Sequence, residues 1–336
     1  RMYRSAMEIE AMTGGDPVER LASRAIAEGW LCPTTLQELR SSTFEEVREA
    51  YARVEREPAP AAEAVEEHLF GPQRSSYPPV PIRDTATTML RATNETLHAA
   101  LAQNPRTILF GEDIEDPKGG VFGITKGLSN DYPGRVVNSP LAEATIAGMA
   151  VGLAAVGWRP IFELQFVDFV GPALNQLMAQ VSNLRWRTRG EWSCPMVLYA
   201  PCGAYLPSGG MWHSQSNEGL FAAIPGLRVG VPSTPEDAAG LLWTATHDED
   251  PSLLLLPKHL LRAESGAASP DTPPVRWGVG RIVQPGTDVT VVAWGNCVEI
   301  ASAAADLLEG ASVEIVDPRT LVPCDWKLIA ESVGKT

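Results

Sequence analysis

The chain has 336 residues, of which 44% are hydrophobic and 20% charged, and its formal net charge is −14. This length predicts two or three folding units with a sizeable apolar core. An acidic surface repels a phosphate backbone, so we expect no nucleic-acid partner, and no apolar run reaches the ~18 residues of a membrane span. The five cysteines form no CxxC pair and the five histidines lack ligand spacing, so we expect no zinc site or disulfide framework and a reducing, cytoplasmic setting. Residues 1–4 also lack the apolar stretch of a secretory signal.

Helical patterns dominate residues 5–57. Asp16 suits a helix N-cap, Pro17 suits the first helical position, and Glu19 completes a capping box, so a helix is expected to begin there. Residues 58–83 change character, with six prolines in a short span. Such a composition is typical of an extended linker or surface arm.

From residue 84 onward, strand-like and helical segments alternate. A helical segment near 85–103 precedes the first strand, and helical segments lie between most of the later strands. This alternation, with strands buried on both faces, predicts an α/β domain with a largely parallel sheet. The expected strands span residues 107–110, 159–166, 195–200, 227–231 and 253–256.

A second proline-rich break covers residues 269–275, and a new α/β unit follows it. Two strands and two helices are expected in this unit, which are too few for an independent doubly wound domain. We therefore expect the last domain to be cut short, with an unsatisfied sheet edge. The expected elements are a strand at 288–294, a helix at 298–308, a strand at 312–316 and a helix at 326–333.

The stretch NSPLAE at residues 138–143 carries the most chemical information. Ser139 is a natural N-cap and Pro140 a natural first helical residue, with small apolar residues over 144–155. Glu143 is therefore expected in the first turn of a closely packed, buried helix. A glutamate there complements the helix dipole, but a buried carboxyl near a helix start also suits acid–base work. The residues by themselves leave both roles open.

Two further segments are candidates for a site. The glycine cluster at residues 119–123 permits a tight turn or the close approach of another group, and the chain contains no P-loop motif. His213 follows two glycines and precedes a helix, which favours an accessible site, whereas a lone histidine is more often structural.

Four blocks of the chain resemble, in the same order, the β subunit of the E1 component of 2-oxo acid dehydrogenases. The resemblance covers about residues 80–336, and the blocks are FGEDIEDPKGGVFGITKGL, RVVNSPLAEATIAGMAVGLAAVGWRPIFELQFVDFV, WHSQSNEGLFAAIPGLRVGVPSTPEDAAGLL and VEIVDPRTLVPCDWKLI. The earlier stretch YRSAMEIEAMTGGDPVERLASRAIAEGW resembles the C-terminal tail of the E1 α subunit. The chain therefore resembles a piece of a fused α–β E1.

The resemblance implies an α/β fold with a thiamine-diphosphate-binding, transketolase-like pyrimidine domain built on a parallel sheet. A helical tail precedes this domain and a partial α/β domain follows it. The implied boundaries are a tail at 1–70, a linker at 71–83, the pyrimidine-binding domain at 84–268, and the start of a transketolase C-terminal domain, truncated, at 280–336.

The resemblance also implies roles for four side chains. Glu143 matches the glutamate that hydrogen-bonds N1′ of the aminopyrimidine of thiamine diphosphate and controls its proton. Glu112 matches an acidic residue near the pyrimidine, and Phe169 matches the aromatic residue on which the pyrimidine stacks, although its context also suits an ordinary core phenylalanine. His213 matches the histidine of the family's HSQ motif, which acts with bound intermediates and in reductive acylation of lipoamide.

Metals and partners follow from the same resemblance. The motif that binds Mg²⁺ and the diphosphate is expected in the α part, before residue 1. The implied partners are the E1 α portion with its diphosphate-binding domain and the E2 lipoyl acyltransferase, in a heterotetramer-like assembly or a dimer of fused chains. A structural potassium ion (K⁺), held largely by backbone carbonyls in some relatives, matches Val197, Ala245, Thr246, Asp248 and Asp250.

The chain departs from the family pattern in two places. It has APCG at residues 200–203 where the family usually has arginine, proline, tyrosine or asparagine, and glycine, and it has LPK at 256–258 where the family usually has glutamate, proline and lysine. Both departures remove a charge, which leaves the substrate and full activity open.

The leading function is oxidative decarboxylation of a 2-oxo acid with acyl transfer to the lipoyl group of E2, leaning to a branched-chain acid over pyruvate. Acetoin cleavage or other ketol chemistry is an alternative, since the PLAE glutamate is shared across the transketolase superfamily. A non-catalytic partial subunit is a third. This chain by itself is expected to bind the cofactor poorly and to be inactive.

Overall fold

The computed structural model describes residues 5–13, 15–83, 85–204 and 209–336. The chain divides after Val65 into two units, and each is described by itself. The expectation about a secretory signal concerns residues 1–4, which lie outside the described residues, as does Asp84, the expected first residue of the pyrimidine-binding domain. No helix among the described residues is long and apolar enough to cross a bilayer.

The first unit is helical. Its second helix begins as predicted, because the Asp16 side chain accepts hydrogen bonds from the amides of Val18 (2.8 Å) and Glu19 (3.4 Å), and Pro17 takes the first helical position. The helices are α1 (Ala6–Thr13), α2 (Pro17–Ala27) and α3 (Pro33–Val54), followed by the 3₁₀ helix η1 (Ala62–Glu66).

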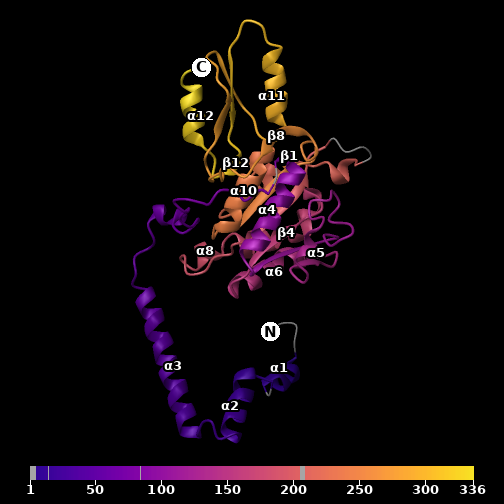
Figure 1. Ribbon diagram of the computed structural model, residues 1–336. Coiled ribbons are helices and arrows are strands. Elements are labelled where there is room, and N and C mark those ends of the chain that lie inside the picture. The colour runs from indigo at the N-terminus through magenta and orange to yellow at the C-terminus, as the bar shows by residue number, and fades with distance from the viewer. Residues whose placement is uncertain (1–4, 14, 84, 205–208) are drawn as a thin grey trace. The chain divides into compact units, whose positions relative to one another are not determined.

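A seven-stranded sheet is the framework of the second unit (Figure 1). Every neighbouring pair of strands is parallel except the edge pair of β12 with β6, so the predicted parallel α/β fold is confirmed. In spatial order the strands are β12 (Thr320–Val322), β6 (Arg228–Gly230), β7 (Ser252–Pro257), β5 (Val197–Cys202), β4 (Arg159–Glu163), β2 (Thr107–Gly111) and β3 (Val136–Asn138).

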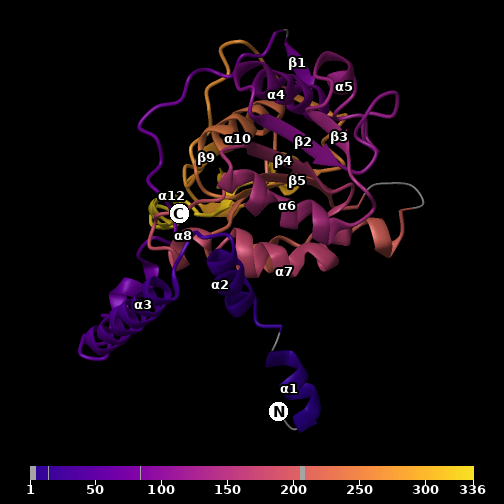
Figure 2. The same ribbon diagram turned by 90° about the horizontal axis from the view of Figure 1, so that it is seen from below.

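Helices cover both faces of this sheet, as Figure 2 shows from below. One core lies between the sheet and helices α4 (Met89–Gln103) and α10 (Pro235–His247), and the other lies under α6 (Glu143–Ala155) and the 3₁₀ helix η2 (Val167–Ala173). Because both faces are buried, a strand such as β7 is apolar throughout instead of alternating. The shorter helices are α5 (Leu128–Asp131), α7 (Leu174–Gln176), the π-helix η3 (Leu177–Val181), α8 (Leu184–Arg187), the 3₁₀ helix η4 (Met211–His213) and α9 (Glu218–Ala222).

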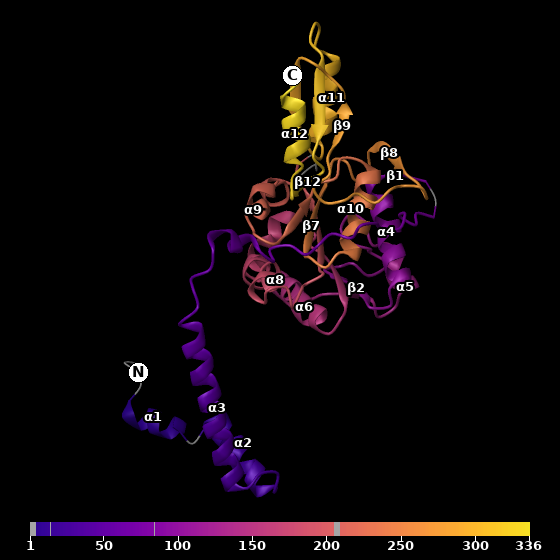
Figure 3. The same cartoon turned by 90° about the vertical axis from the view of Figure 1, so that its left-hand side faces the viewer.

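A second, three-stranded sheet follows, with α11 and α12 beside it (Figure 3). Its central strand β11 is parallel to β10 and antiparallel to β9, and β10 lies at an edge, where Val289 is 46% exposed. The sequence predicted two strands here and missed β9 and β12, because runs of four and three residues are too short to show a period. The elements are β9 (Arg281–Gln284), β10 (Val289–Val292), α11 (Cys297–Asp306), β11 (Val313–Asp317) and α12 (Trp326–Val333).

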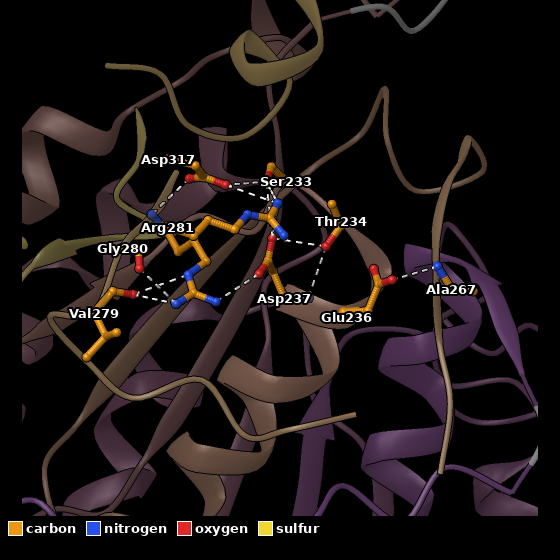
Figure 4. Close-up of polar contacts among 10 residues, drawn as sticks. Ser233, Thr234, Glu236, Asp237, Ala267, Val279, Gly280, Arg281 and Asp317 are labelled. Carbon is orange, nitrogen blue, oxygen red and sulfur yellow. Dashed lines mark hydrogen bonds and ion pairs between the residues drawn. The ribbon is translucent and has the colours of Figure 1, made fainter. Parts of the chain in front are cut away.

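A buried polar network joins this small sheet to the start of α10 (Figure 4). Arg281 pairs with Asp237 (2.9 Å) and Asp317 (3.4 Å), and Arg319 reaches Asp237 at 3.4 Å. The side chains of the two aspartates are 2% and 0% exposed, and Ser233 donates hydrogen bonds to both. Since a buried carboxylate that loses its partner is strongly unfavourable, the network ties the two sheets together.

The proline-rich arm that precedes the large sheet is packed along it. Val80 and Ile82 are buried, the Gly71 amide donates to Asp250 (2.8 Å), and the Tyr77 hydroxyl donates to Asp248 (2.5 Å). A short antiparallel pair, β1 (Ala86–Thr88) with β8 (Glu264–Ala268), follows the arm.

Candidate functional site

The predicted site residues gather where the parallel strands end. Glu112 directly follows β2, Phe169 lies in η2 after β4, His213 lies in η4 after β5, and Glu143 opens α6 after β3. Carboxyl ends of parallel strands share one edge of a sheet, and ligands of open α/β sheets bind outside that edge. Two groups of side chains lie there, the carboxyls of Glu112 and Glu143 and an aromatic cluster with the histidine.

Glu143 is the first residue of α6, so the helix starts there and not at Pro140. The expectation that Ser139 caps the helix is wrong: its amide donates to Gly111 O (2.7 Å) and extends the pairing of β3 with β2. The N-cap is Ala142, which has no side chain to bond the first turn. Glu143 is therefore the side chain that meets the partial positive charge of this helix start.

The expectation of a closely packed, buried helix holds for one face of α6 only. Ile146, Ala147 and Ala150 are buried, but Met149 is 38% exposed and Val156, just beyond the helix, is 67% exposed. One apolar face of α6 is thus open in this chain.

Glu112 is the buried member of the carboxyl pair. Glu112 is only 7% exposed, and its Oε1 accepts no hydrogen bond from the described part of the chain. Burial, and after it the charges of Glu143 and Asp113, raise the pKa of Glu112. The carboxyl therefore keeps its proton to a higher pH than an ordinary glutamate, and one of its oxygens is open to a further group.

His213 lies in an aromatic cluster with Phe166 and Phe169. Ring centroids are 4.6 Å apart for Phe166–His213, 5.5 Å for Phe169–His213 and 5.7 Å for Phe166–Phe169, all near edge-to-face. Phe122, from the predicted glycine segment, packs on Phe166 at 5.4 Å. The sequence reading found Phe169 and missed Phe166, which stands three residues earlier in the same FVDF stretch.

One nitrogen of the histidine ring is bonded, and no residue that the structure describes bonds the other. Its Nδ1 lies 3.1 Å from Gly209 O. A carbonyl oxygen only accepts, so Nδ1 carries the hydrogen and Nε2 of the neutral ring has a free lone pair. His213 is thereby set to accept a proton at Nε2.

Two charged residues that the sequence did not single out adjoin the histidine. Lys258, 8% exposed, donates from its ammonium to His213 O. Asp168 accepts from the amides of Ser214 (2.9 Å) and Gln215 (3.0 Å) through one oxygen. These contacts join residues more than forty positions apart, which no local pattern in the sequence reveals.

The glycine segment covers a further buried carboxyl, that of Glu163. Gly119 and Gly120 have φ of 68° and 79°, and a Cβ on Gly120 would lie 3.0 Å from Glu163 Oε1. Burial raises the pKa of Glu163 to about 7, and the Tyr199 hydroxyl, which donates to it at 2.5 Å, partly offsets that rise. The close approach explains why glycine stands at this position.

The residues matched to a potassium ion lie at the amino ends of β5 and β7 and at the end of α10, so the structure does not bring them to the carboxyl-end site. Asp250 already accepts from Arg185 (2.7 Å) and Arg228 (2.6 Å), and the Asp248 carbonyl accepts from Arg159. The potassium assignment stays a prediction. No cluster of three or more metal-binding side chains occurs among the described residues.

The two departures from the family pattern fall in the interior. Ala200 and Leu256, which stand where the family usually has charges, are 0% and 1% exposed and belong to the two cores. An apolar side chain suits both positions.

Comparison with known proteins places these features in a family. Residues 85–264 match the pyrimidine binding domain of transketolase, and residues 278–336 match the transketolase C-terminal domain. The 2-oxoisovalerate dehydrogenase subunit beta of Bacillus subtilis is 42% identical over 248 residues, which cover 73% of this chain and 75% of that protein. The pyruvate dehydrogenase E1 component subunit beta of Acholeplasma laidlawii is 42% identical over 256 residues, covering 74% and 76%.

A solved structure shares the fold. A "split gene transketolase, inactive beta4 tetramer" superposes with a TM-score of 0.63 at 24% identity, covering 74% of this chain and 77% of that one. This likeness supports the α/β architecture described above.

Proposed function

Because this chain belongs to the E1 β-subunit family of 2-oxo acid dehydrogenases, we propose that it supplies the ring-activating half of a thiamine-diphosphate site. The reaction is oxidative decarboxylation of a 2-oxo acid, with the acyl group passed to the lipoyl group of E2. The observation that carries the proposal is that Glu143 opens α6 after β3, at the sheet edge where the buried Glu112 follows the neighbouring strand β2.

The residues present fit thiamine diphosphate. Glu112 Oε1 is a buried acceptor without a partner, and an aminopyrimidine offers N–H donors. Phe169 is partly exposed at the same edge and offers a flat apolar surface to a pyrimidine. When bound, the cofactor supplies the electron sink that cleavage next to a keto carbon requires.

The protein residues then have separate tasks. Glu143 would hold a proton at N1′ of the pyrimidine, and the raised pKa of Glu112 would favour its protonated form and so limit like-charge repulsion between the two carboxyls. His213 accepts or returns a proton at Nε2 while the acyl group moves to the lipoyl sulfur. The aromatic rings around it keep water from the reacting atoms.

We propose that the rest of the site comes from an E1 α portion, which contributes the diphosphate and Mg²⁺ positions, and that residues 1–70 are the tail of such a portion in a fused protein. A lipoyl domain of E2 is the acceptor. A branched-chain 2-oxo acid is the preferred substrate and pyruvate the second. Assay of the α-containing enzyme with 2-oxoisovalerate, pyruvate and acetoin, each with lipoamide, tests this order, and activity confined to acetoin would overturn the dehydrogenase assignment.

The substitution Glu143→Gln in the assembled enzyme tests the mechanism. The amide keeps the size of the side chain but does not shuttle a proton, so turnover is expected to fall by ~100- to 10,000-fold. C2–H exchange of the bound cofactor, followed by NMR, should slow in parallel while cofactor binding is retained. Glu309→Gln, at an exposed glutamate in the small α/β unit, is the matched control and should leave both unchanged. Wild-type exchange in Glu143→Gln would return Glu143 to the role of a helix-start carboxylate.

A further inference from the structure

His213 lies in a loop whose described backbone bonds next to the histidine are long, although the Gly203 amide ties the loop further on by donating to Gln215 O (2.8 Å). η4 has three residues, and the preceding Gly210 has φ of 57°. Within the loop, the His213 amide donates weakly to Gly210 O (3.4 Å), and the Gln215 side chain to Met211 O (3.4 Å). A ring that transfers a proton has to be held in a well-defined position, and two bonds of 3.4 Å do not fix it.

Lys258 reaches this loop from the large sheet. It directly follows β7, and its amide donates to Cys202 O (2.9 Å), which continues the β7–β5 ladder by one residue and fixes where the side chain begins. The ammonium donates to His213 O and lies 5.0 Å from the centroid of the Phe166 ring. Among the described residues no carboxylate forms an ion pair with it, although it is nearly inaccessible to water.

Such a lysine is costly to bury, and the hydrogen bond to His213 O and the face of the Phe166 ring are the contacts that offset this cost. Burial lowers the pKa of Lys258, and the charge of Asp168 partly opposes that shift. A lysine kept only for stability would be expected to pair with a carboxylate or to lie on the surface.

Asp168 holds the other side of the same peptide group. One of its oxygens accepts from the amides of Ser214 and Gln215, at 2.9 Å and 3.0 Å. The His213 carbonyl and the Ser214 amide belong to one planar trans peptide and point in opposite directions. Lys258, at the end of β7, and Asp168, in η2, therefore form hydrogen bonds with this peptide group from opposite sides.

We propose that Lys258 and Asp168 are positioning residues that orient His213 for acyl transfer to the lipoyl group. This inference rests on the proposed function, since it assumes that His213 acts in that step. Neither residue needs to touch the substrate. Both act through the backbone of the histidine, whose ring is then held by Gly209 O and the two phenylalanines.

Two half-reactions measured on the assembled, α-containing enzyme test this clamp, by which we mean the hydrogen bonds of Lys258 and Asp168 to the peptide group between His213 and Ser214. Acyl transfer is followed with lipoamide, and decarboxylation is followed with ferricyanide as the electron acceptor in place of the lipoyl group. In Lys258→Met the ratio of the transfer kcat to the decarboxylation kcat should fall by roughly 10- to 100-fold, because a small displacement of an acid–base group is enough to cause such a loss. KM for lipoamide should change little, because the clamp does not bind it.

Four further variants make the result decisive. Asp168→Asn should lower the same ratio, and the double variant should lose little more than either single one, since both act on one peptide. Lys327→Met, at an 86% exposed lysine of α12, is the control and should be silent. The positioning role of Lys258 and Asp168 is refuted if both half-reactions are lost equally. It is also refuted if the ratio is unchanged in both single variants while His213→Gln is impaired. Normal transfer in His213→Gln overturns the role of His213, and the clamp with it.

Discussion

Asp250 is the central acceptor of a buried cluster, and the loss of folding stability on removing its charge follows from the contacts that it makes. It accepts from Arg185, Arg228 and the Gly71 amide, and the side-chain exposures are 3% for Asp250, 3% for Arg228 and 13% for Arg185. Asp250→Asn keeps the shape and removes the charge. Two guanidiniums, which do not lose their protons, then lose the carboxylate with which they form ion pairs in the interior. Breaking a buried pair in this way costs about 3–5 kcal/mol.

Urea unfolding measures this loss. The buried Trp243 and Trp277 report on the second unit by fluorescence, and the midpoint should move down by roughly 1–3 M. Trypsin should also cut faster after the exposed Arg74, because the Gly71 contact holds the arm that contains it. Glu331→Gln breaks an exposed pair with Lys327 (3.8 Å) and should cost less than about 1 kcal/mol. A loss equally small in Asp250→Asn would refute the reasoning and show that water reaches the two arginines.

The glycine segment and Glu163 give two further predictions. Gly119→Ala and Gly123→Ala both place a side chain at positive φ, which costs about 1–2 kcal/mol. Only at Gly119 would the new Cβ also clash with backbone, because it would lie 2.5 Å from Lys126 Cα. Gly119→Ala should therefore unfold at a clearly lower urea concentration than Gly123→Ala. Burial raises the pKa of Glu163 from 4.5 to about 7, so its contribution to stability is full below pH 4.5 and is lost as pH rises through about 7. The stability of the wild type relative to Glu163→Gln should fall by about 3 kcal/mol across that window, and a flat difference would show that Glu163 is solvated.

Features with a local cause were predictable from the sequence. The Asp16 cap was confirmed because a cap bonds amides two and three residues away. Helix α12 was predicted from residue 326 to 333, where Asp325 accepts from the Leu328 amide. The parallel sheet was predictable because strands buried on both faces read as unbroken apolar runs.

Features with a distant cause were missed. Ser139 has every local property of a cap, but Gly111 O takes its amide and keeps it in the strand. Lys258 is the lysine of the LPK stretch at 256–258, yet its contact with His213 spans 45 residues of sequence. The sequence located the carboxyl and the histidine, and tertiary contacts supplied their neighbours.

Strand β12 makes the two sheets topologically interlocked. The chain leaves the large sheet after β7, forms β9, β10 and β11 of the small sheet, and then returns with β12, which pairs with β6. A nick in the proline-rich break at 269–275 would therefore not release a free fragment, because the piece after the cut still contributes an edge strand to the piece before it. The small domain is in this sense no separable module: exchanging it for that of a relative would replace one strand of the pyrimidine domain as well.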